Sequence, residues 1–347
     1  MDLSTYDANC LGNPTFNLFG LPVTEPEARL VIVPVPWEVT VSYSAGTARA
    51  AENVRKASRQ VDLYDPHHHD LWRKGFFMRE VDKKILLKSD YLRKEAELYI
   101  DYISSGEELE KNNFMCRSLK EINEGSRFLN NWVHTQTSEL IRQGKLVALL
   151  GGDHSTPFGF IKALAEKHDS FGILQIDAHC DLRRAFERFT YSHASIMYNV
   201  LEELPAVSRL VQLGARDYCD EEIDYINASN GRVVPFFDRH VKEALYEGAT
   251  WQSVASRIID ALPEKVYISF DVDGLQPNLC PNTGTPVPGG LEPDQVFYLL
   301  RKLIDSGRQI IAFDLVEIGV GDNDWDANVG ARLLLQLCNL LTASNPA

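Results

Sequence analysis

The stretch V-Y-I-S-F-D-V-D, residues 266–273, indicates the kind of fold that this chain adopts. Its first five residues form a short apolar run, which predicts a strand covered on both faces, as the strands of parallel sheets are. Two aspartates follow at once. Ligands bind at the carboxyl ends of the strands in open parallel sheets. The stretch therefore predicts a buried strand that ends in a polar site.

Similar apolar runs alternate with amphipathic stretches along the chain, which predicts βαβ units and a mostly parallel central sheet, the α/β class. The expected strands are residues 30–35, 146–150, 171–176, 210–213, 232–236, 266–270 and 309–313. The expected helices are residues 47–61, 118–144, 157–167, 194–201, 251–262, 293–306 and 327–341.

Residues 64–113 break this rhythm, because they are polar, charged and less periodic, with a helix expected at 89–104. We interpret the segment as an insertion or cap within one domain that spans residues 1–347. It contains His67, His68 and His69 in a row after Pro66. Three adjacent histidines cannot all point one way, so a solvated loop is favoured over a metal site.

Composition narrows the classes of partner and compartment. The 347 residues carry a formal net charge of −14, a field that repels nucleic acid and anionic membranes. The start, MDLSTYDANC, does not read as a secretory signal, and no run approaches the roughly 20 apolar residues of a membrane span. The cysteines lie far apart without a C-x-x-C pair, which predicts reduced, mostly buried thiols in a cytoplasmic protein. They are Cys10, Cys116, Cys180, Cys219, Cys280 and Cys338.

Three polar clusters each follow a predicted strand directly: G-G-D-H-S at 151–155, D-A-H-C-D at 177–181 and D-V-D at 271–273. Parallel strands bring their carboxyl ends to one edge, so the clusters are expected to meet in one crevice. In an extended segment, residues i and i+2 face the same side. On that basis Asp177, His179 and Asp181 should point together, and Asp271 should point with Asp273.

Such a group of acidic side chains needs cations. An aspartate at the end of one strand often only caps the next helix, but three clusters in order indicate a shared site. Convergent carboxylates repel one another unless a divalent ion binds between them. Four aspartates and two histidines exceed what one tetrahedral ion needs and suit two ions bridged by shared carboxylates.

With these motifs the sequence resembles the ureohydrolase (arginase/agmatinase) family. The family signatures are G-G-D-H-[ST], D-A-H-x-D and S-x-D-x-D followed by a proline, and here they stand at residues 151–155, 177–181 and 269–277. The similarity continues through T-G-T-P at 283–286 and P-G-G at 288–290, and covers roughly residues 28 to 341.

The resemblance implies a three-layer α/β/α sandwich and a site for two divalent ions, manganese in the family, with nickel, cobalt or zinc also compatible with these ligands. It implies that one ion is held by His154, Asp177, Asp181 and Asp271. The other ion would be held by Asp177, His179, Asp271 and Asp273. Asp177 and Asp271 would then bridge the pair.

The chemistry expected of this pair is hydrolysis of a guanidino C–N bond with release of urea. Two ions that share a water lower its pKa towards neutrality, and Asp181 could orient it. The leaving amine needs a proton, and the resemblance assigns a shuttle histidine to His193, although Ala194 stands where the family commonly has glycine. It assigns Glu317 to the substrate guanidinium through paired hydrogen bonds.

The sequence is compatible with several substrates. The loop at 182–190 faces the far end of the substrate in the family, and it carries Arg183, Arg184 and Arg188. Pointing inward, these could bind a carboxylate or narrow the pocket; pointing outward, they are surface residues. Agmatine is the leading substrate. The alternatives are guanidine, another small alkylguanidine or biguanide, a guanidino acid, arginine and formiminoglutamate.

A hypothesis of a different class is also open, namely a non-catalytic regulatory subunit that binds an active relative. By analogy with the family, we expect a homo-oligomer, a trimer or a hexamer, with a hetero-oligomer as the alternative.

Overall fold

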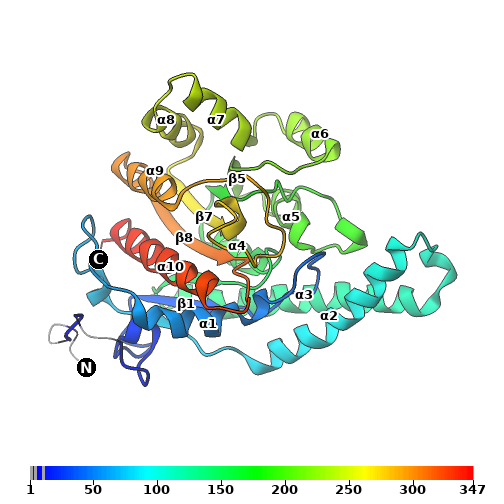
Figure 1. Ribbon diagram of the computed structural model, residues 1–347, viewed down its shortest axis with the longest axis horizontal. Coiled ribbons are helices and arrows are strands. Elements are labelled where there is room, and N and C mark those ends of the chain that lie inside the picture. Colours follow the sequence, from blue (N-terminus) through cyan, green and yellow to red (C-terminus); the bar gives the residue numbers. More distant parts are fainter. Residues whose placement is uncertain (1–2, 4–5, 10–11, 347) are drawn as a thin grey trace.

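The computed structural model describes residues 3, 6–9 and 12–346, and its centre is an eight-stranded sheet (Figure 1). All strand pairs are parallel, in the order β2-β1-β3-β8-β7-β4-β5-β6. The strands are β1 (Leu30–Pro34), β2 (Phe76–Met78), β3 (Leu146–Leu150), β4 (Phe171–Ile176), β5 (Val207–Leu213), β6 (Val233–Phe236), β7 (Lys265–Asp271) and β8 (Gln309–Val316).

Helices cover both faces of this sheet (Figure 1). On one face α1, α9 and α10 pack together, and on the other α3, α4 and α5 do so, which confirms the predicted three-layer α/β/α sandwich. The helices are α1 (Ala50–Ala57), α2 (Lys83–Ser104), α3 (Asn113–Arg142), α4 (Phe158–Lys167), α5 (Ile196–Glu203), α6 (Asp220–Ala228), α7 (Asp238–Tyr246), α8 (Trp251–Ala261), α9 (Pro293–Asp305) and α10 (Trp325–Ala343). None of them, within the described part of the chain, is long and apolar enough to cross a membrane.

The sheet is buried because its strands are apolar on both sides. Every residue of β1, β3 and β4 is buried, as parallel strands between two helical layers require. The helix starts follow ordinary capping. Asp82 accepts the Lys84 and Ile85 N–H groups at the start of α2, and Asn112 does the same for Phe114 and Met115 at the start of α3.

All seven predicted strands are present, and three elements escaped prediction. The strand β2 has only three residues, too few for a clear pattern. The helix α6 is rich in acidic residues and buries only Glu222 and Ile226, and α7 buries only Asp238 and Val241. The helix α6 shows little of the 3.6-residue period that marks an amphipathic helix. The helix α7 does gather its apolar residues on one face, but with nine residues it is too short for the pattern to stand out.

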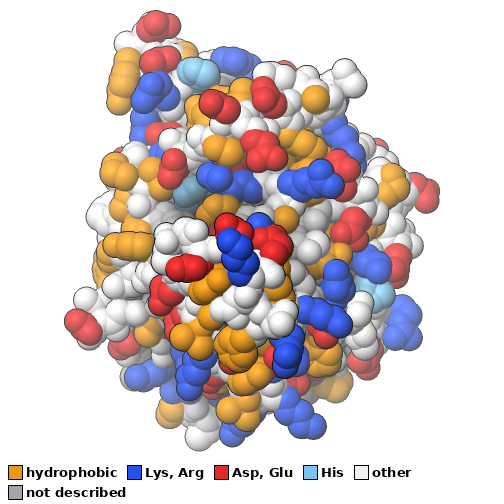
Figure 2. All heavy atoms as spheres, turned by 90° about the vertical axis from the view of Figure 1, so that its right-hand side faces the viewer, with side chains coloured by type: hydrophobic (Ala, Val, Ile, Leu, Met, Phe, Trp, Pro, Cys, Tyr) orange, Lys and Arg blue, Asp and Glu red, His pale blue; other side chains and the backbone are white. Residues whose placement is uncertain are grey.

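The segment 64–113 supplies the edge strand β2 and the helix α2, which pairs with α3. The two long helices project from the body (Figure 1). Figure 2 looks onto that end of the molecule and shows basic and acidic side chains interspersed among apolar ones. His67, His68 and His69 lie in a loop, where His67 and His69 are exposed, as predicted.

The cysteines largely follow the prediction. Cys180, Cys280 and Cys338 are buried free thiols, whereas Cys219 is half-buried and Cys116 is exposed. The remaining one, Cys10, lies outside the described residues.

Candidate active site

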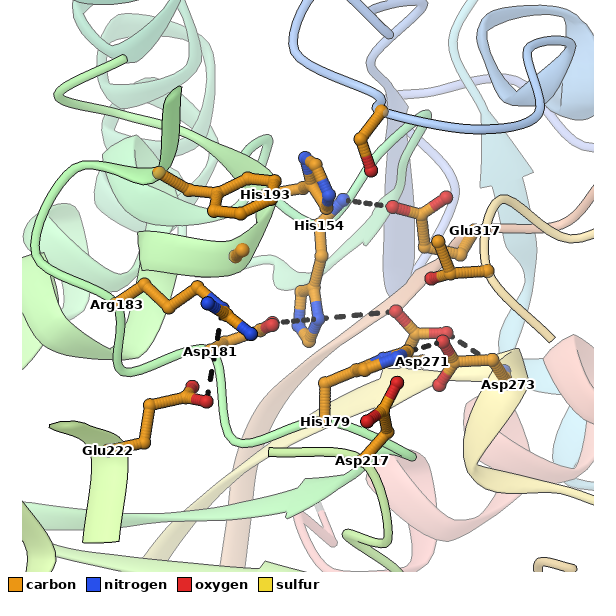
Figure 3. Close-up of a pocket in the computed structure, with 14 residues that line it drawn as sticks. His154, His179, Asp181, Arg183, His193, Asp217, Glu222, Asp271, Asp273 and Glu317 are labelled. Carbon is orange, nitrogen blue, oxygen red and sulfur yellow. Dashed lines mark hydrogen bonds and ion pairs between the residues drawn. The ribbon is translucent and has the colours of Figure 1, made fainter. Parts of the chain in front are cut away.

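The predicted polar clusters meet in one cavity of about 160 Å³ at the carboxyl ends of the central strands (Figure 3). They follow β3, β4 and β7, and a fourth group follows β8, so that the four central strands each contribute. The lining residues are Ser42, His154, His179, Asp181, Arg183, Phe186, His193, Ala194, Asp217, Glu222, Asp271, Asp273, Thr285 and Glu317.

His154 is surrounded by carboxylate oxygens. Its Nδ1 lies 2.9 Å from Asp177 Oδ2, 2.9 Å from Asp181 Oδ2 and 3.3 Å from Asp271 Oδ2. Although it is buried, this nitrogen has no hydrogen-bond partner among the described residues. An imidazole nitrogen left without a partner and faced by three hard oxygens matches the donor set of a divalent metal ion.

A second group of donors adjoins the first. His179 Nδ1 lies 3.0 Å from Asp273 Oδ2 and 3.5 Å from Asp177 Oδ1. Asp177 therefore presents Oδ2 to His154 and Oδ1 to His179. The ligand atoms of each set, His154–Asp177–Asp181 and Asp177–His179–Asp273, lie within 4.8 Å of one another. One carboxylate is shared by two groups of donors, as in a site for two ions.

The side chains converge as expected, but alternation in an extended chain does not account for all of them. His179 forms a β-bridge with Asp217, as an extended segment would, whereas Asp181 and Asp273 leave extended backbone. Asp273 lies in a turn of 3-10 helix, Val272–Gly274, and Asp181 has a positive φ of 55°. Glu317 also has a positive φ, 61°. Such backbone costs of order 1–3 kcal/mol for a residue other than glycine and gathers at functional sites. Turns therefore bring Asp181 and Asp273 to the other ligands.

The charges of the group are mutually dependent. Burial opposes the charged form of His154, but the surrounding carboxylates raise its pKa well above the usual value. The same balance raises the pKa of His179. Burial and the charge of Asp177 raise the pKa of Asp181 to about 7, and burial with the charge of Asp273 raises the pKa of Asp271 well above its usual value. Without a cation the cluster holds extra protons, which a metal ion would displace.

Buried polar groups behind the cluster orient it. His154 Nε2 lies 2.9 Å from Ser269 Oγ, whose hydroxyl donates to Asp314 at 3.2 Å. Behind the shared carboxylate, Gln175 Nε2 donates to Asp177 Oδ2 at 2.8 Å, and Gln212 donates to Gln175 Oε1 at 2.7 Å. Partners of this kind fix the direction in which a metal ligand points.

Glu317 reaches the cavity from the end of β8. Its Oε1 accepts the His154 N–H at 2.9 Å, while the buried Oε2 has no partner among the described residues. A Cβ on Gly284 would lie 3.0 Å from that oxygen, so glycine leaves the space beside it open. Burial and the charge of Asp153 raise the pKa of Glu317 well above its usual value. The free oxygen is available to a cationic group in the cavity.

His193 lies on the same cavity, at the start of a 3-10 helix that leads into α5 (Figure 3). Its backbone N–H donates to Thr40 Oγ1 at 3.1 Å, and its Nδ1 lies 3.4 Å from the same oxygen. Burial and the nearby charges of His179 and His154 lower the pKa of His193 to about 3. The ring is therefore neutral at physiological pH.

The three arginines of the 182–190 loop separate into two groups. Arg183 lines the cavity, with Nε 3.9 Å from Glu222 Oε2 and its guanidinium 5.0 Å from the centre of the Phe186 ring. Arg184 and Arg188 are exposed, and Arg188 pairs with Glu110 at 2.9 Å. Arg184 and Arg188 are therefore surface residues, whereas Arg183 points into the cavity.

Two acidic residues of the cavity were missed from the sequence, Asp217 and Glu222. Asp217 follows β5, and its only signal was its place after a predicted strand. Glu222 lies on α6 and is 2% exposed, held by the N–H groups of Leu182 and Cys219. Nothing in the sequence distinguishes it from the other acidic residues around it.

Comparison with known proteins gives consistent matches over most of the chain. The sequence profile of the arginase family matches residues 28–338. An N(1)-aminopropylagmatine ureohydrolase of Thermus thermophilus is 30% identical over 293 residues, 84% of this chain and 83% of the relative. The agmatinase of Neisseria meningitidis serogroup B is 27% identical over 343 residues, 96% and 94% of the two chains. The solved proclavaminate amidino hydrolase of Streptomyces clavuligerus shares the fold, with a TM-score of 0.69 at 19% identity over 95% and 97% of the chains.

Proposed function

The chain belongs to the arginase family, and we propose from this that it is a metal-dependent hydrolase that cleaves the guanidino C–N bond of a cationic substrate, agmatine first, to give urea and an amine. The observation that carries the proposal is the shared carboxylate. Asp177 faces His154 through one oxygen and His179 through the other, beside a cavity that also contains Glu317.

The metal ions implied by the family fit the residues present. His154, Asp177, Asp181 and Asp271 would hold one ion, and Asp177, His179, Asp271 and Asp273 the other. When bound, such a pair lowers the pKa of water and supplies a nucleophile at neutral pH. Imidazole nitrogen and carboxylate oxygen suit Mn²⁺, which we propose as the native ion, with Ni²⁺ as the alternative.

The protein side chains then do three things. Glu317 holds the substrate guanidinium through Oε2, which has no other partner among the described residues. Asp181 orients the attacking water by accepting a hydrogen bond from it. His193 takes up the proton that the attacking water loses and delivers it to the departing amine, so the ring alternates between its neutral and protonated forms. The hydroxyls of Thr40 and Ser192 lie next to Nδ1, which leaves Nε2 for this task.

The far end of the cavity favours a second positive charge on the substrate. Asp217 and Glu222 contribute two carboxylates, against one guanidinium from Arg183. The amines of agmatine and N(1)-aminopropylagmatine, named in the relatives, meet this charge balance. We propose that Arg183 contacts the substrate chain and limits its width. A guanidino acid is the second candidate, because Arg183 could pair with its carboxylate.

A urea-release assay tests the function. Metal-free protein is reconstituted with Mn²⁺ or Ni²⁺ and offered agmatine, N(1)-aminopropylagmatine, arginine, guanidine, guanidinobutyrate and a biguanide. Formiminoglutamate is tested in parallel with formamide as the measured product, because its formamidine carbon cannot give urea. We expect the highest kcat/KM for one of the two amine-bearing guanidines. A protein with two bound ions that releases urea from none of them would instead support the hypothesis of a regulatory subunit.

We also propose that the chain is one domain, because one sheet and one continuous core run through its described part, with residues 64–113 inserted at the β2 edge. A cytoplasmic location agrees with the five free thiols described. The homo-oligomer stays a prediction from the family resemblance.

A further inference from the structure

Two side chains of α2 bind the backbone of the loop that follows β1. Ser89 Oγ accepts the Glu38 N–H at 3.1 Å, and Arg93 Nη1 donates to Val39 O at 3.4 Å and to Val41 O. Ser89 and Arg93 are four residues apart and so lie on one face of the helix. Buried backbone groups of a loop need partners. Here the helix satisfies three of them within four residues.

The other side of this loop lies against the candidate active site. Trp37 O accepts the Asp153 N–H at 2.8 Å, and a Cβ on Gly152 would lie 1.8 Å from the same oxygen, so the loop packs directly on the motif. Thr40 is fully buried and contacts His193 at the backbone N–H and at Nδ1. A continuous series of contacts therefore leads from Arg93 to His193.

The helix α3 holds the second loop that adjoins His193. Asn123 Oδ1 accepts the Thr190 N–H at 2.7 Å, and its Nδ2 donates to Arg188 O at 3.3 Å. The Tyr99 ring of α2 lies 5.3 Å from that of Phe189, which is fully buried. Residues 188–190 are thus held by α3 and α2, and residues 38–41 by α2.

We propose that the α2–α3 hairpin, residues 83–142, is a positioning device for His193, with Arg93 as its main positioning residue and Asn123 as the second. The proposal rests on the proposed role of His193 in proton transfer. Neither Arg93 nor Asn123 lines the cavity formed by the described residues, so both hold His193 through the loops. The charge of Arg93 also contributes to the lowered pKa of His193, after burial and the charges of His179 and His154. The Arg93 side chain is 12% exposed and is paired with Glu97 at 3.0 Å, which holds its guanidinium in place.

The consequence is a specific kinetic signature. A misplacement of about 1 Å can cost about 10²-fold in rate, because proton transfer requires close alignment. Arg93 contacts neither Glu317 nor a predicted metal ligand; its hydrogen bonds go to Val39 and Val41, whereas the loop touches the Gly152–Asp153 motif at Trp37. Loss of Arg93 should therefore lower kcat while KM and metal content stay near the wild-type values.

The test compares four single variants, and Arg93→Met is also made in a His193→Ala background. Arg93→Met removes the donors and keeps most of the alkyl chain, Arg93→Lys keeps one cationic donor, and Asn123→Ala opens the second loop. The matched control is Arg49→Met, which breaks a different arginine contact between α2 and the body, the exposed pair with Asp90 at 2.9 Å. For each we would measure kcat, KM, bound metal, thermal unfolding and hydrogen exchange of residues 37–46 and 188–195.

We expect Arg93→Met to lower kcat about tenfold to hundredfold, with faster exchange in residues 37–46, and Arg93→Lys to recover part of both. Asn123→Ala should act on residues 188–195 in the same direction. Arg49→Met should match the wild type. In a His193→Ala background, Arg93→Met should change kcat little further, since its effect passes through that ring.

Two results would overturn the proposal: wild-type kcat and exchange in Arg93→Met, or an equal fall in kcat with and without His193. If the wild-type protein released no urea from any compound, the proposed function would fail separately. Hydrogen exchange of residues 37–46 would still test whether Arg93 holds this loop. An unchanged exchange rate in Arg93→Met would refute that part of the proposal.

Discussion

The Thr40 hydroxyl contacts His193 at two atoms, the backbone N–H at 3.1 Å and the ring Nδ1 at 3.4 Å. A hydroxyl oxygen has two lone pairs, so it can accept the backbone N–H and an Nδ1–H together. In that arrangement the neutral ring has its free lone pair on Nε2, where it can take up and release a proton. Thr40 thus fixes the place of the ring, and the Ser192 hydroxyl, 3.3 Å from Nδ1, shares the contact with this nitrogen.

Replacing Thr40 with valine tests this relationship, since valine keeps the shape and loses the hydroxyl. We expect kcat to fall by about tenfold to hundredfold with KM little changed, and Thr40→Ser to stay close to the wild type. Steady-state kinetics on the best substrate would show it. Equal kcat values for the valine and serine variants would contradict the role of the hydroxyl.

Asp273→Asn should remove one ion and most of the activity while the fold survives. The amide is a poorer ligand than the carboxylate, and the Ala178 N–H that donates to Asp273 Oδ1 still has an oxygen to bind. Mutation of a residue that only hydrogen-bonds a metal ligand costs about 10–100-fold in metal affinity or activity. Since Asp273 is itself a predicted ligand, we expect kcat/KM to fall by at least about 10²-fold. Elemental analysis and circular dichroism would follow it, with the exposed Asp322→Asn as the control. Wild-type turnover in Asp273→Asn would show that the site is misassigned.

Glu317→Gln should weaken substrate binding. Gln can still accept the His154 N–H, so the local structure is kept, but it replaces a charged acceptor of the guanidinium with an amide. A hydrogen bond to a charged group contributes about 1.5–3 kcal/mol. This predicts a fall in kcat/KM of about 10- to 100-fold or more, with two ions still bound. An unchanged kcat/KM would place the guanidinium elsewhere.

Gln175→Leu should reduce metal affinity although Gln175 is not a ligand. Leucine keeps the volume and removes the donor to Asp177 Oδ2, so the shared carboxylate loses its support. Residues that hydrogen-bond a metal ligand in this way change the metal affinity by about 10–100-fold when they are mutated. Titration of the metal-free protein with Mn²⁺ would measure the change, and Gln143→Leu, on the surface, should have no effect. If both variants bind Mn²⁺ equally well, the amide does not act on Asp177.

Removal of the metal should change the pH dependence of stability. The folded, metal-free protein has raised pKa values at His154 and His179. It therefore gains stability from their protons below the ordinary histidine pKa and loses this gain as pH rises above it. Metal ions displace the protons and bind better at higher pH. Thermal unfolding between pH 6 and 9 should show the gap between Mn²⁺-loaded and chelator-treated protein widening with pH. A constant gap would argue against proton displacement.

The sequence was most informative where function adjoins a predicted strand. The six predicted metal ligands come directly after apolar strands, so a local pattern was enough to group them. The directions in which the ligand side chains point were not predictable, because the positive φ of Asp181 and the turn that contains Asp273 depend on the packing of the loops. The inward course of Arg183 depends in the same way on the ring of Phe186 and on Glu222.

Residues that act across the fold left no such signal. Glu222, Arg93 and Asn123 lie on helices, among charged residues of the same kinds. Only the contacts of α2, α3 and α6 with the cavity loops distinguish them from solvated neighbours. Tertiary packing, and not local pattern, assigns these residues to the site.

The strand order has a consequence for how the protein comes apart. The ligand clusters follow β3, β4 and β7, and Glu317 follows β8, which are the four innermost strands, while β2 and β6 form the two borders of the sheet. Partially unfolded forms that shed a border strand would retain the complete ligand set. Release of bound ions during denaturation should accordingly coincide with the final, global transition and not with the first loss of structure.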